Sequence, residues 1–384
     1  MKSYKSGIYI SQGSYKSFQP TLINKQWILD DMEILKLLGQ ADRELGRLDM
    51  YSEYIPNIDL FISMHVLKEA TQSTKIEGTQ TNMEDALLEK ENVPLNKRDD
   101  WEEVQNYIAA MNKAQKSLNN IPFSSRLIKE AHKTLLTGVR GKHKLPGEFR
   151  ASQNWIGGAT ISDAGFIPPV HTAVSDYMSD LEKFVHNEQA PFPEILKIAF
   201  VHYQFETIHP FLDGNGRVGR LMITLYLVSK GILKQPILYL SDFFERNRTL
   251  YYDNLTRVRE KNDIQQWFKF FLVGVIETAQ NGIKTFDHIL KLQKETEVKI
   301  QKLGSRAANA QKLLNYLYQH PMIVPTKVAE VVSISATSAY KLVADFEKMG
   351  ILKEITGGKR GKFYLFKKYI DLFEQSGMKS SIKK

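Results

Sequence analysis

The stretch "HPFLDGNGRVGR", His209 to Arg220, sets the expectations for the fold and chemistry of this 384-residue sequence. Its twelve residues include three glycines, one imidazole, one carboxylate, one carboxamide and two guanidinium groups. Glycine tolerates positive φ and leaves backbone N–H groups uncovered, so Asp213 to Gly216 predict a tight, bare turn. The apolar spacing that follows predicts a helix over 215–230. We therefore expect a turn that opens directly into a helix N-terminus.

A bare turn at a helix N-terminus binds anions, because the N–H groups and the helix dipole point at the ligand. Arg217 and Arg220 are three residues apart and share one helix face, where two cations disfavour the helix unless negative charge arrives from outside. Phosphates supply that charge, and arginine recognises them in bidentate fashion. Asp213 adds an oxygen ligand suited to Mg²⁺, and His209 can accept a proton at neutral pH. The combination predicts phosphoryl or nucleotidyl transfer, against the alternative of a solvated turn between two core helices.

The same twelve residues resemble the Fic family motif, His-x-Phe-x-Asp/Glu-Gly-Asn-Gly-Arg-x-x-Arg, at every specified position. The resemblance covers roughly residues 60–280. It implies an enzyme, a protein adenylyltransferase that moves AMP from ATP to a Tyr, Thr or Ser hydroxyl of a target protein or of itself. It implies that His209 is the general base, that Phe211 anchors the loop and that Asp213 is the Mg²⁺ ligand. The residues implied to bind ATP are Glu77, His209, Gly214, Asn215, Gly216, Arg217, Val218, Gly219, Arg220 and Tyr252.

A second stretch, "STKIEG", Ser73 to Gly78, closes a helix predicted over 58–78 and resembles the family's inhibitory motif, Ser/Thr-x-x-x-Glu-Gly/Asn. The resemblance implies that Ser73, Glu77 and Gly78 are inhibitory residues. Glu77 is expected to pair with Arg220 and to occupy the guanidinium that should hold the γ-phosphate. The alternative is a solvated glutamate before a C-capping glycine. In some relatives this glutamate also supports removal of AMP, so de-AMPylation stays open.

Two segments flank the expected nucleotide site. The Gly- and Pro-rich stretch 138–170 predicts loops and a short hairpin, and the resemblance implies that Ile161–Val170 is a flap on which the target protein docks in strand fashion. The segment "NRTLYYDNL" resembles the region that closes on the adenosine, with Tyr252 in contact and Tyr251 in the core. His202 is expected to be a hydrogen-bonded core histidine, because the spacing of a zinc site is missing.

The net charge of +9 is concentrated at the C-terminal end, because residues 301–384 hold 15 Lys and Arg against 6 Asp and Glu. This segment predicts a winged helix: three helices, with a short turn near Ser333–Ser335, and two extended pieces around a glycine-rich wing. The residues that would contact a DNA backbone are Ser338, Tyr340, Lys341, Lys359, Arg360 and Lys362. A protein-docking or dimerisation module is an equal alternative.

The predicted fold class is therefore mainly α, a Fic-domain helical core with a short β-hairpin flap and a C-terminal winged helix-turn-helix domain. The expected domains are an N-terminal extension (1–57), the Fic domain (58–280), a linker helix (281–304) and the winged helix (305–384). The sequence has no cysteine and no apolar run of membrane-spanning length, so we expect a cytoplasmic protein without a membrane partner. The resemblance also implies a homodimer. Trp155 and Trp267 are expected in the core.

Two rival hypotheses remain. One is a DNA-binding regulator whose Fic core senses nucleotide without catalysis. The other is a Fic enzyme that transfers a different phosphate-containing group. The intact base His209, together with Asp213 and Asn215, disfavours both, because a sensor needs no base and relatives with other chemistry tend to depart from the motif.

Overall fold

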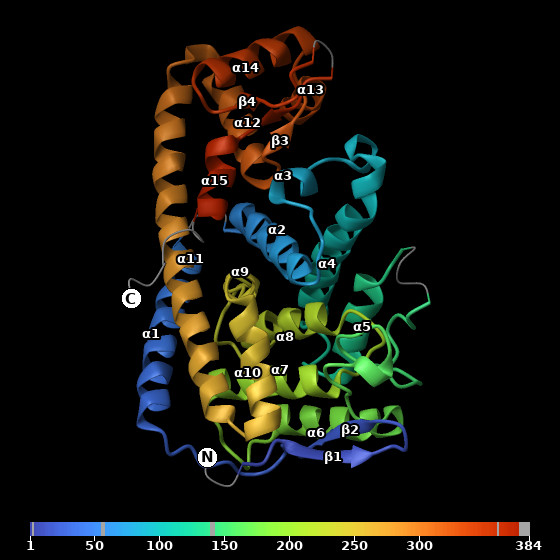
Figure 1. The fold of residues 1–384 in the computed structure, drawn as a ribbon. Coiled ribbons are helices and arrows are strands. Elements are labelled where there is room, and N and C mark those ends of the chain that lie inside the picture. Colours follow the sequence, from blue (N-terminus) through green and yellow to red (C-terminus); the bar gives the residue numbers. More distant parts are fainter. Residues whose placement is uncertain (2–3, 55–57, 139–142, 359–360, 376–384) are drawn as a thin grey trace.

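The computed structural model describes residues 1, 4–54, 58–138, 143–358 and 361–375 of the chain. The chain is mainly helical (Figure 1), so the predicted fold class is confirmed at that level. The wing residues Lys359 and Arg360 lie outside the described residues. The α-helices are α1 (Met32–Tyr54), α2 (Asp59–Ile76), α3 (Met83–Ala86), α4 (Arg98–Ser117), α5 (Ser125–Leu135), α6 (Val174–His186), α7 (Glu194–Ile208), α8 (Asn215–Ser229), α9 (Ser241–Arg246), α10 (Arg248–Lys261), α11 (Ile264–Gln301), α12 (Ala307–Gln319), α13 (Pro325–Val332), α14 (Ala336–Lys348) and α15 (Lys367–Gln375).

The strands are short and form two small antiparallel sheets. One is the hairpin that the sequence predicts near the N-terminus, and the other, in the order β3-β5-β4, lies in the C-terminal region. The strands are β1 (Gly7–Ser11), β2 (Lys16–Pro20), β3 (Met322–Ile323), β4 (Lys353–Glu354) and β5 (Tyr364–Leu365), and the single-turn 3₁₀ helices are η1 (Lys90–Asn92), η2 (Leu95–Lys97), η3 (Ile161–Asp163), η4 (His171–Ala173) and η5 (Gly304–Arg306).

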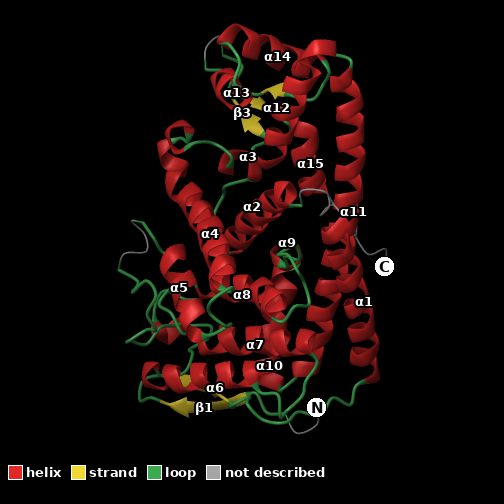
Figure 2. Cartoon of the chain, turned by 180° about the vertical axis from the view of Figure 1, so that it is seen from behind, coloured by secondary structure: helices red, strands yellow, loops and turns green. Residues whose placement is uncertain are grey.

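Helices α7 and α8 form the centre of the molecule, between α6 on one side and α4 on the other (Figure 2). Every residue of α7 from Ile195 to Ile208 is buried, so this helix has no solvent face. A helix that is apolar all round belongs in a core. The turn that joins α7 to α8 is therefore fixed at both ends by the most buried part of the chain.

The longest helix is α11, with 38 residues. The sequence predicts two helices here, 263–280 and 282–303, and this prediction is wrong, because α11 runs through Gly282 without a break. A Cβ at Gly282 would lie 3.0 Å from Leu48 Cδ1 of α1, so this glycine allows close packing of α1 on α11. At 1.5 Å per residue, α11 spans about 57 Å and connects the main body to the C-terminal domain (Figure 1).

Two further predictions need correction. The single helix expected over 241–259 is broken into α9 and α10 at Asn247. The Asn247 side chain donates a hydrogen bond to the carbonyl of Phe243 at 2.9 Å, a local bond that competes with continued helix. Trp267 is buried as expected, but Trp155 is 39% exposed and lies outside the core.

The C-terminal domain holds α12 to α15 and the three short strands. The three predicted helices are present, and the turn between α13 and α14 passes through Ser333, which has a left-handed φ of 60°. The Ser335 hydroxyl caps α14 by accepting a bond from the Ser338 N–H. Tyr340 is exposed on α14. These are the elements expected of a winged helix, while its role stays a prediction. In the part of the chain that the structure describes, no helix has the length and apolar character to cross a membrane.

Candidate active site

His209 ends α7 in a conformation that is uncommon for a non-glycine residue, with φ of 50° and ψ of 60°. Its backbone is held from two directions. The carbonyl oxygen accepts hydrogen bonds from Arg150 Nε at 3.0 Å and from Asn154 Nδ2 at 3.3 Å. Its N–H donates to the carbonyl of Phe205 at 2.8 Å. Backbone held in such a region by its surroundings clusters at functional sites.

The imidazole of His209 is set up to accept a proton. Its Nδ1 lies 3.3 Å from the carbonyl oxygen of Glu206, a distance that suits a donated Nδ1–H. Among the described residues Nε2 has no hydrogen-bond partner. Burial is the main cause that lowers the pKa of His209 to about 4, with a smaller contribution from the charge of Arg150. The ring is therefore neutral at pH 7, as a general base must be.

The loop after His209 is braced by buried side chains. Phe211 is fully buried, as predicted, and stacks on His132 with 3.7 Å between the ring centroids. The Asn215 carboxamide accepts from the Phe211 N–H at 2.8 Å and donates to the Phe211 carbonyl at 2.9 Å. Asn154 donates to the same carbonyl at 2.8 Å, and His132 Nε2 lies 3.0 Å from the carbonyl of Asp213. Arg150, His132 and Asn154 all lie outside the motif, and no pattern in the sequence marked them.

The N-terminus of α8 has the geometry expected of an anion site. Gly214 precedes it with a φ of 75°, and a Cβ there would press on Leu135 at 3.1 Å, so the turn requires glycine. A Cβ at Gly216 would collide with the carboxylate of Glu77 and approach Arg220 Nη1 to 2.9 Å. The first N–H groups of a helix lack partners within it. The Glu77 carboxylate therefore lies against the turn where the sequence predicts phosphates.

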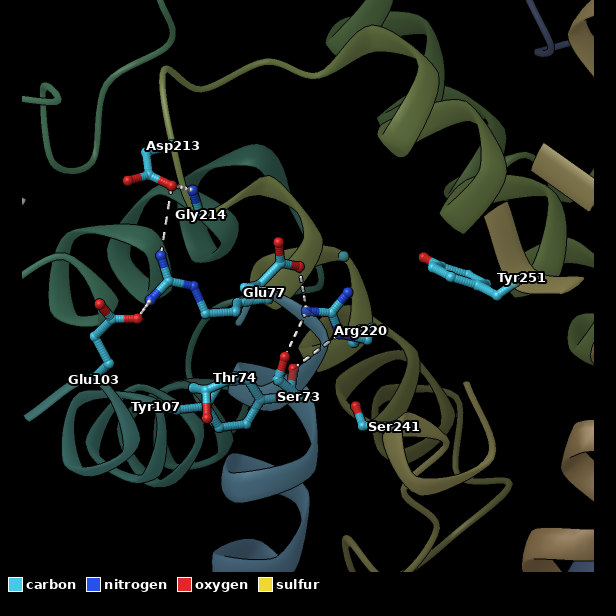
Figure 3. Close-up of polar contacts among 12 residues, drawn as sticks. Ser73, Thr74, Glu77, Glu103, Tyr107, Asp213, Gly214, Arg220, Ser241 and Tyr251 are labelled. Carbon is cyan, nitrogen blue, oxygen red and sulfur yellow. Dashed lines mark hydrogen bonds and ion pairs between the residues drawn. The ribbon is translucent and has the colours of Figure 1, made fainter. Parts of the chain in front are cut away.

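Glu77 belongs to the end of α2 and forms an ion pair with Arg220 of α8, with 2.6 Å between Oε1 and Nη2 (Figure 3). Arg220 also donates from Nε to Ser73 Oγ and from Nη2 to the Ser73 carbonyl, each at 2.9 Å. Burial alone would raise the pKa of the Glu77 carboxyl, but the Arg220 charge and hydrogen bond bring it below its ordinary value. Gly78 follows with a φ of 108° and ends the helix. These are the contacts that the inhibitory motif implies, while the inhibition itself is untested.

Arg217 lies on the same helix but pairs with a different element. Its Nη1 lies 3.0 Å from Glu103 Oε2 of α4, and its Nη2 lies 3.6 Å from Asp213 Oδ1. The Arg217 side chain is buried, and its Nε has no partner among the described residues. The sequence gave no sign of Glu103, which lies 114 positions upstream.

Asp213 is the residue expected to bind Mg²⁺, and its side chain is 46% exposed. One of its oxygens accepts the Gly214 N–H at 2.6 Å. Within the described ranges no group of three or more His, Cys, Asp or Glu side chains that could hold a metal ion lies together. A single exposed carboxylate fits an ion that takes its other ligands from phosphates and water, as Mg²⁺ does.

On α10, Tyr252 is 39% exposed, whereas Tyr251 is fully buried with its hydroxyl 2.9 Å from His202 Nε2. The other ring nitrogen of His202 lies 2.9 Å from the Gly219 carbonyl, so His202 is a hydrogen-bonded core residue, as predicted. Val218 points into the core. The structure thus separates an accessible tyrosine from a structural one.

The β-hairpin expected at the flap is not formed as strands: one isolated β-bridge joins Phe166 of the flap to Ile156, which precedes it, and the single turn η3 lies between them. Hydrogen bonds attach the flap to the rest of the protein, among them one from Gln153 Nε2 to the Pro168 carbonyl at 3.1 Å. The Phe18 N–H of β2 donates to the Ile167 carbonyl at 2.9 Å, and Arg150 Nη2 donates to the Pro169 carbonyl. Because Arg150 also holds His209, the flap and the loop share one support.

Two family models match this chain. The model described as Fic/DOC family N-terminal matches residues 35–116, and the Fic/DOC family model matches residues 122–227. The first range contains the Ser73–Gly78 segment and the second contains the His209–Arg220 loop. The chain belongs to the Fic/DOC family.

Curated relatives of this Fic protein carry the name protein adenylyltransferase. The protein adenylyltransferase Fic of Aedes aegypti is 34% identical over 125 residues, which are 32% of this chain and 22% of that protein. A probable protein adenylyltransferase of Aquifex aeolicus is 27% identical over 163 residues, which are 41% of this chain and 47% of that protein. The chain thus matches between about a fifth and a half of the length of these relatives.

Solved structures share the Fic fold. A crystal structure of a Fic family protein from Desulfovibrio desulfuricans has a TM-score of 0.58 at 17% identity and covers 89% of this chain and 98% of that chain. A Fic domain containing signaling protein from Bacteroides thetaiotaomicron has a TM-score of 0.53 at 19% identity, over 66% of this chain and 97% of that chain. At these identities the likeness concerns the fold alone.

Proposed function

We propose that this Fic protein is a protein adenylyltransferase, which transfers AMP from ATP to a Tyr, Thr or Ser hydroxyl of a target protein and of itself. The observation that carries the proposal is a neutral imidazole, His209, next to a helix N-terminus that already holds one carboxylate, that of Glu77. The names of the curated relatives support the same reaction. A cytoplasmic location and docking of the target on the Ile161–Val170 flap belong to the same proposal.

In the proposed reaction the target hydroxyl attacks the α-phosphorus of ATP. The hydroxyl proton passes to Nε2 of His209, a bond forms between the target oxygen and the α-phosphorus, and the bond from that phosphorus to the bridging oxygen of the β-phosphate breaks. Pyrophosphate leaves with the bond's electron pair. No covalent enzyme intermediate is needed, so the chain contributes position and charge. The brace formed by Arg150, Asn154 and Asn215 suits this task, because it fixes the loop before ATP arrives.

ATP would lie along the first turn of α8. The backbone N–H groups of Asn215 and Gly216, which follow the Gly214 turn, would face the phosphates, and Arg217 and Arg220 would neutralise the outer phosphates. Asp213 would hold Mg²⁺, which supplies positive charge to the phosphate oxygens when bound. Tyr252, the accessible member of the tyrosine pair, would contact the adenosine.

Glu77 would inhibit by competing with the γ-phosphate for Arg220. Arg220 is almost fully buried, while the Glu77 side chain is 36% exposed, so solvent screens part of their attraction. A charge-assisted hydrogen bond of this kind contributes about 1.5–3 kcal/mol, the upper part of which corresponds to roughly a hundredfold suppression. Because of this exposure we expect a suppression of about ten- to a hundredfold.

ATP labelled at the α- or the γ-phosphate tests the proposal on the Glu77→Gly variant. We expect the protein to take up label from the α position alone. Label from the γ position on protein would make the chain a phosphotransferase and overturn the proposal. Binding of ATP with no label from either position would favour a nucleotide-sensing regulator. De-AMPylation is tested by adding unlabelled wild-type chain to labelled protein and measuring release of AMP.

A further inference from the structure

Helix α2 is shared between two parts of the molecule. Its C-terminal end carries Ser73 and Glu77 to the candidate active site, and its N-terminal half packs against the C-terminal domain (Figures 1 and 2). The Phe61 ring lies 5.4 Å from Tyr318 of α12 and 6.4 Å from Tyr369 of α15, between ring centroids. All three rings are fully buried. Aromatic contacts of this kind contribute to stability beyond the area that they bury.

A second contact lies one turn further along α2. The His65 ring lies 5.0 Å from Phe373 of α15 and 5.0 Å from Phe286 of α11. Burial is the main cause that lowers the pKa of His65 to about 3, so this ring is neutral and packs as an apolar group. The start of α2 therefore belongs to an aromatic cluster that is made mainly by the C-terminal domain.

The C-terminal domain also holds the chain just beyond the inhibitory segment. Lys367, the first residue of α15, lies 2.6 Å from Glu84 of α3 and also contacts Asp371 and Glu374 within α15. Glu84 follows Gly78 by six residues. The same domain thus contacts α2 near its start and the chain after its end.

A helix transmits a displacement along its axis, because its backbone is hydrogen-bonded throughout. Sixteen residues separate Phe61 from Glu77, which corresponds to about 24 Å of helix. Beside α2 lies a small cavity of about 50 Å³, partly open to solvent and bordered by Lys68 and Gln72 of α2, Thr278 and Asn281 of α11 and Phe373 of α15. Incomplete packing on this side leaves α2 room to shift, whereas a filled core would resist it.

We propose that the C-terminal domain takes part in the inhibition. Its contacts with Phe61, His65 and Glu84 hold α2 in the position in which Glu77 pairs with Arg220. An event that loosens this domain from α2 therefore activates the enzyme without touching the nucleotide site. The inference rests on the proposed function, since it assumes that Glu77 inhibits AMP transfer.

The test compares self-labelling from α-labelled ATP in four full-length chains: wild type, Phe61→Ala, Glu77→Gly and the double variant. We expect Phe61→Ala to raise labelling about five- to tenfold, a typical size for coupling between sites. The double variant should take up the same amount of label as Glu77→Gly alone, because the Glu77–Arg220 ion pair that Phe61 supports is already absent. Tyr316→Ala is the matched control, since this ring lies on α12 beside His320 and its pairing involves no residue of α2.

A variant that changes a surface charge, together with amide hydrogen exchange, tests the inference even if Phe61→Ala does not fold. Glu84→Lys places two like charges at the α3–α15 contact and should raise labelling about twofold, since an exposed pair contributes little. Glu330→Lys, which breaks the local Lys327–Glu330 pair of α13, should change nothing. Amide hydrogen exchange should become faster at residues 70–78 in the folded Phe61→Ala and Glu84→Lys variants and stay unchanged in both controls.

Three outcomes are informative. Folded Phe61→Ala and Glu84→Lys with wild-type labelling and wild-type exchange would overturn the inference. An equal rise in the Glu77→Gly background would also overturn it, because the effect would then bypass the lock. Failure of the proposed function looks different: Glu77→Gly itself would take up no label, while the exchange measurement would still report whether α2 depends on the C-terminal domain.

Discussion

The loop at His209–Arg220 and the inhibitory segment at Ser73–Gly78 meet at Arg220 but are held in different ways. The loop is fixed by buried bonds to its backbone, from Arg150, Asn154 and its own Asn215. The carboxylate of Glu77, which we propose to be inhibitory, has one ion pair among the described residues and is more than a third exposed. The loop is therefore held rigidly in the absence of a ligand, whereas the contact between Glu77 and the loop is weak enough to be broken.

This difference has a physical reason. A catalytic loop gains when its atoms are fixed before the substrate binds, because no ordering remains to be done in the reaction. An inhibitory contact must be reversible. Its free energy must therefore be small enough for a competing ligand, or a small shift of α2, to break the contact. The comparison predicts that changes in the loop abolish activity while changes in the segment release it.

The largest expected effect is loss of the base. In the Glu77→Gly background, His209→Ala should lower the rate of AMP transfer by about 10²–10⁴-fold, the usual contribution of a general base. Rapid-mixing assays with α-labelled ATP measure the rate, and ATP affinity should change little. His209→Asn is the control for the backbone, because asparagine tolerates the left-handed conformation at this position. A variant that keeps most of its rate would remove His209 from the mechanism.

The second effect is release of the lock. Glu77→Gly should raise self-modification about ten- to a hundredfold, as expected for a charge-assisted contact that is partly screened. Because Arg220 lowers the pKa of Glu77, the pair is complete above the ordinary pKa of 4.5 and is lost only as the pH falls through the lowered value. Inhibition of the wild-type chain should therefore persist from about pH 6 upward. An inactive Glu77→Gly variant that still binds ATP would contradict the assignment.

The sequence predicted the ion pair between Glu77 and Arg220 because both residues belong to recognisable motifs. Each motif fixes residue types at fixed spacing, so Glu77, Ser73 and Arg220 could be named without coordinates. The same reasoning missed Arg150, His132 and Asn154, because these residues reach the loop only through the fold. A buried histidine in a helical sequence such as "IKEAHKTLL" looks like any amphipathic position.

The helices with one polar face were predicted well, whereas the positions at which one helix ends and the next begins were predicted less well. The sequence predicted a separate linker helix over 281–304, yet α11 continues through Gly282, since the packing of this glycine on Leu48 outweighs its low helix propensity. Asn247 gave no strong sign of a break, yet its side chain bonds to the preceding turn and ends α9. Both errors arise from tertiary or side-chain contacts that local spacing does not contain.

A third, smaller effect tests the brace. Asn154→Ala removes one donor from each of the carbonyls of His209 and Phe211, which keep their bonds from Arg150 and Asn215, so each lost hydrogen bond costs about 0.5–1.5 kcal/mol. We expect roughly tenfold slower AMP transfer in the Glu77→Gly background, with little change in the KM for ATP. Steady-state kinetics measures both values. Asn187→Ala, which breaks a bond to Asn24 far from the loop, is the matched control and should keep the rate.

The smallest expected effect is on the pH dependence of the rate. It distinguishes a His209 imidazole whose pKa is lowered by burial from one with the ordinary pKa. The folded chain protonates His209 only near pH 4, while the unfolded chain does so near 6.5, so the ring stays neutral as the pH falls through 6.5. The rate at saturating ATP of Glu77→Gly should therefore change less than about twofold between pH 7.5 and 6. Stability behaves differently: the unfolded state binds the proton first, so the free energy of unfolding falls as the pH drops from 6.5 toward 4.

Nuclear magnetic resonance of histidine-labelled protein measures the pKa directly, with the His209 signal identified by its loss in His209→Ala. A midpoint near 6.5 would mean that the imidazole is as hydrated as in a free peptide. The loop would then lack the fixed, water-poor setting that separates it from the inhibitory segment, and the contrast between the two regions would fail at its central residue.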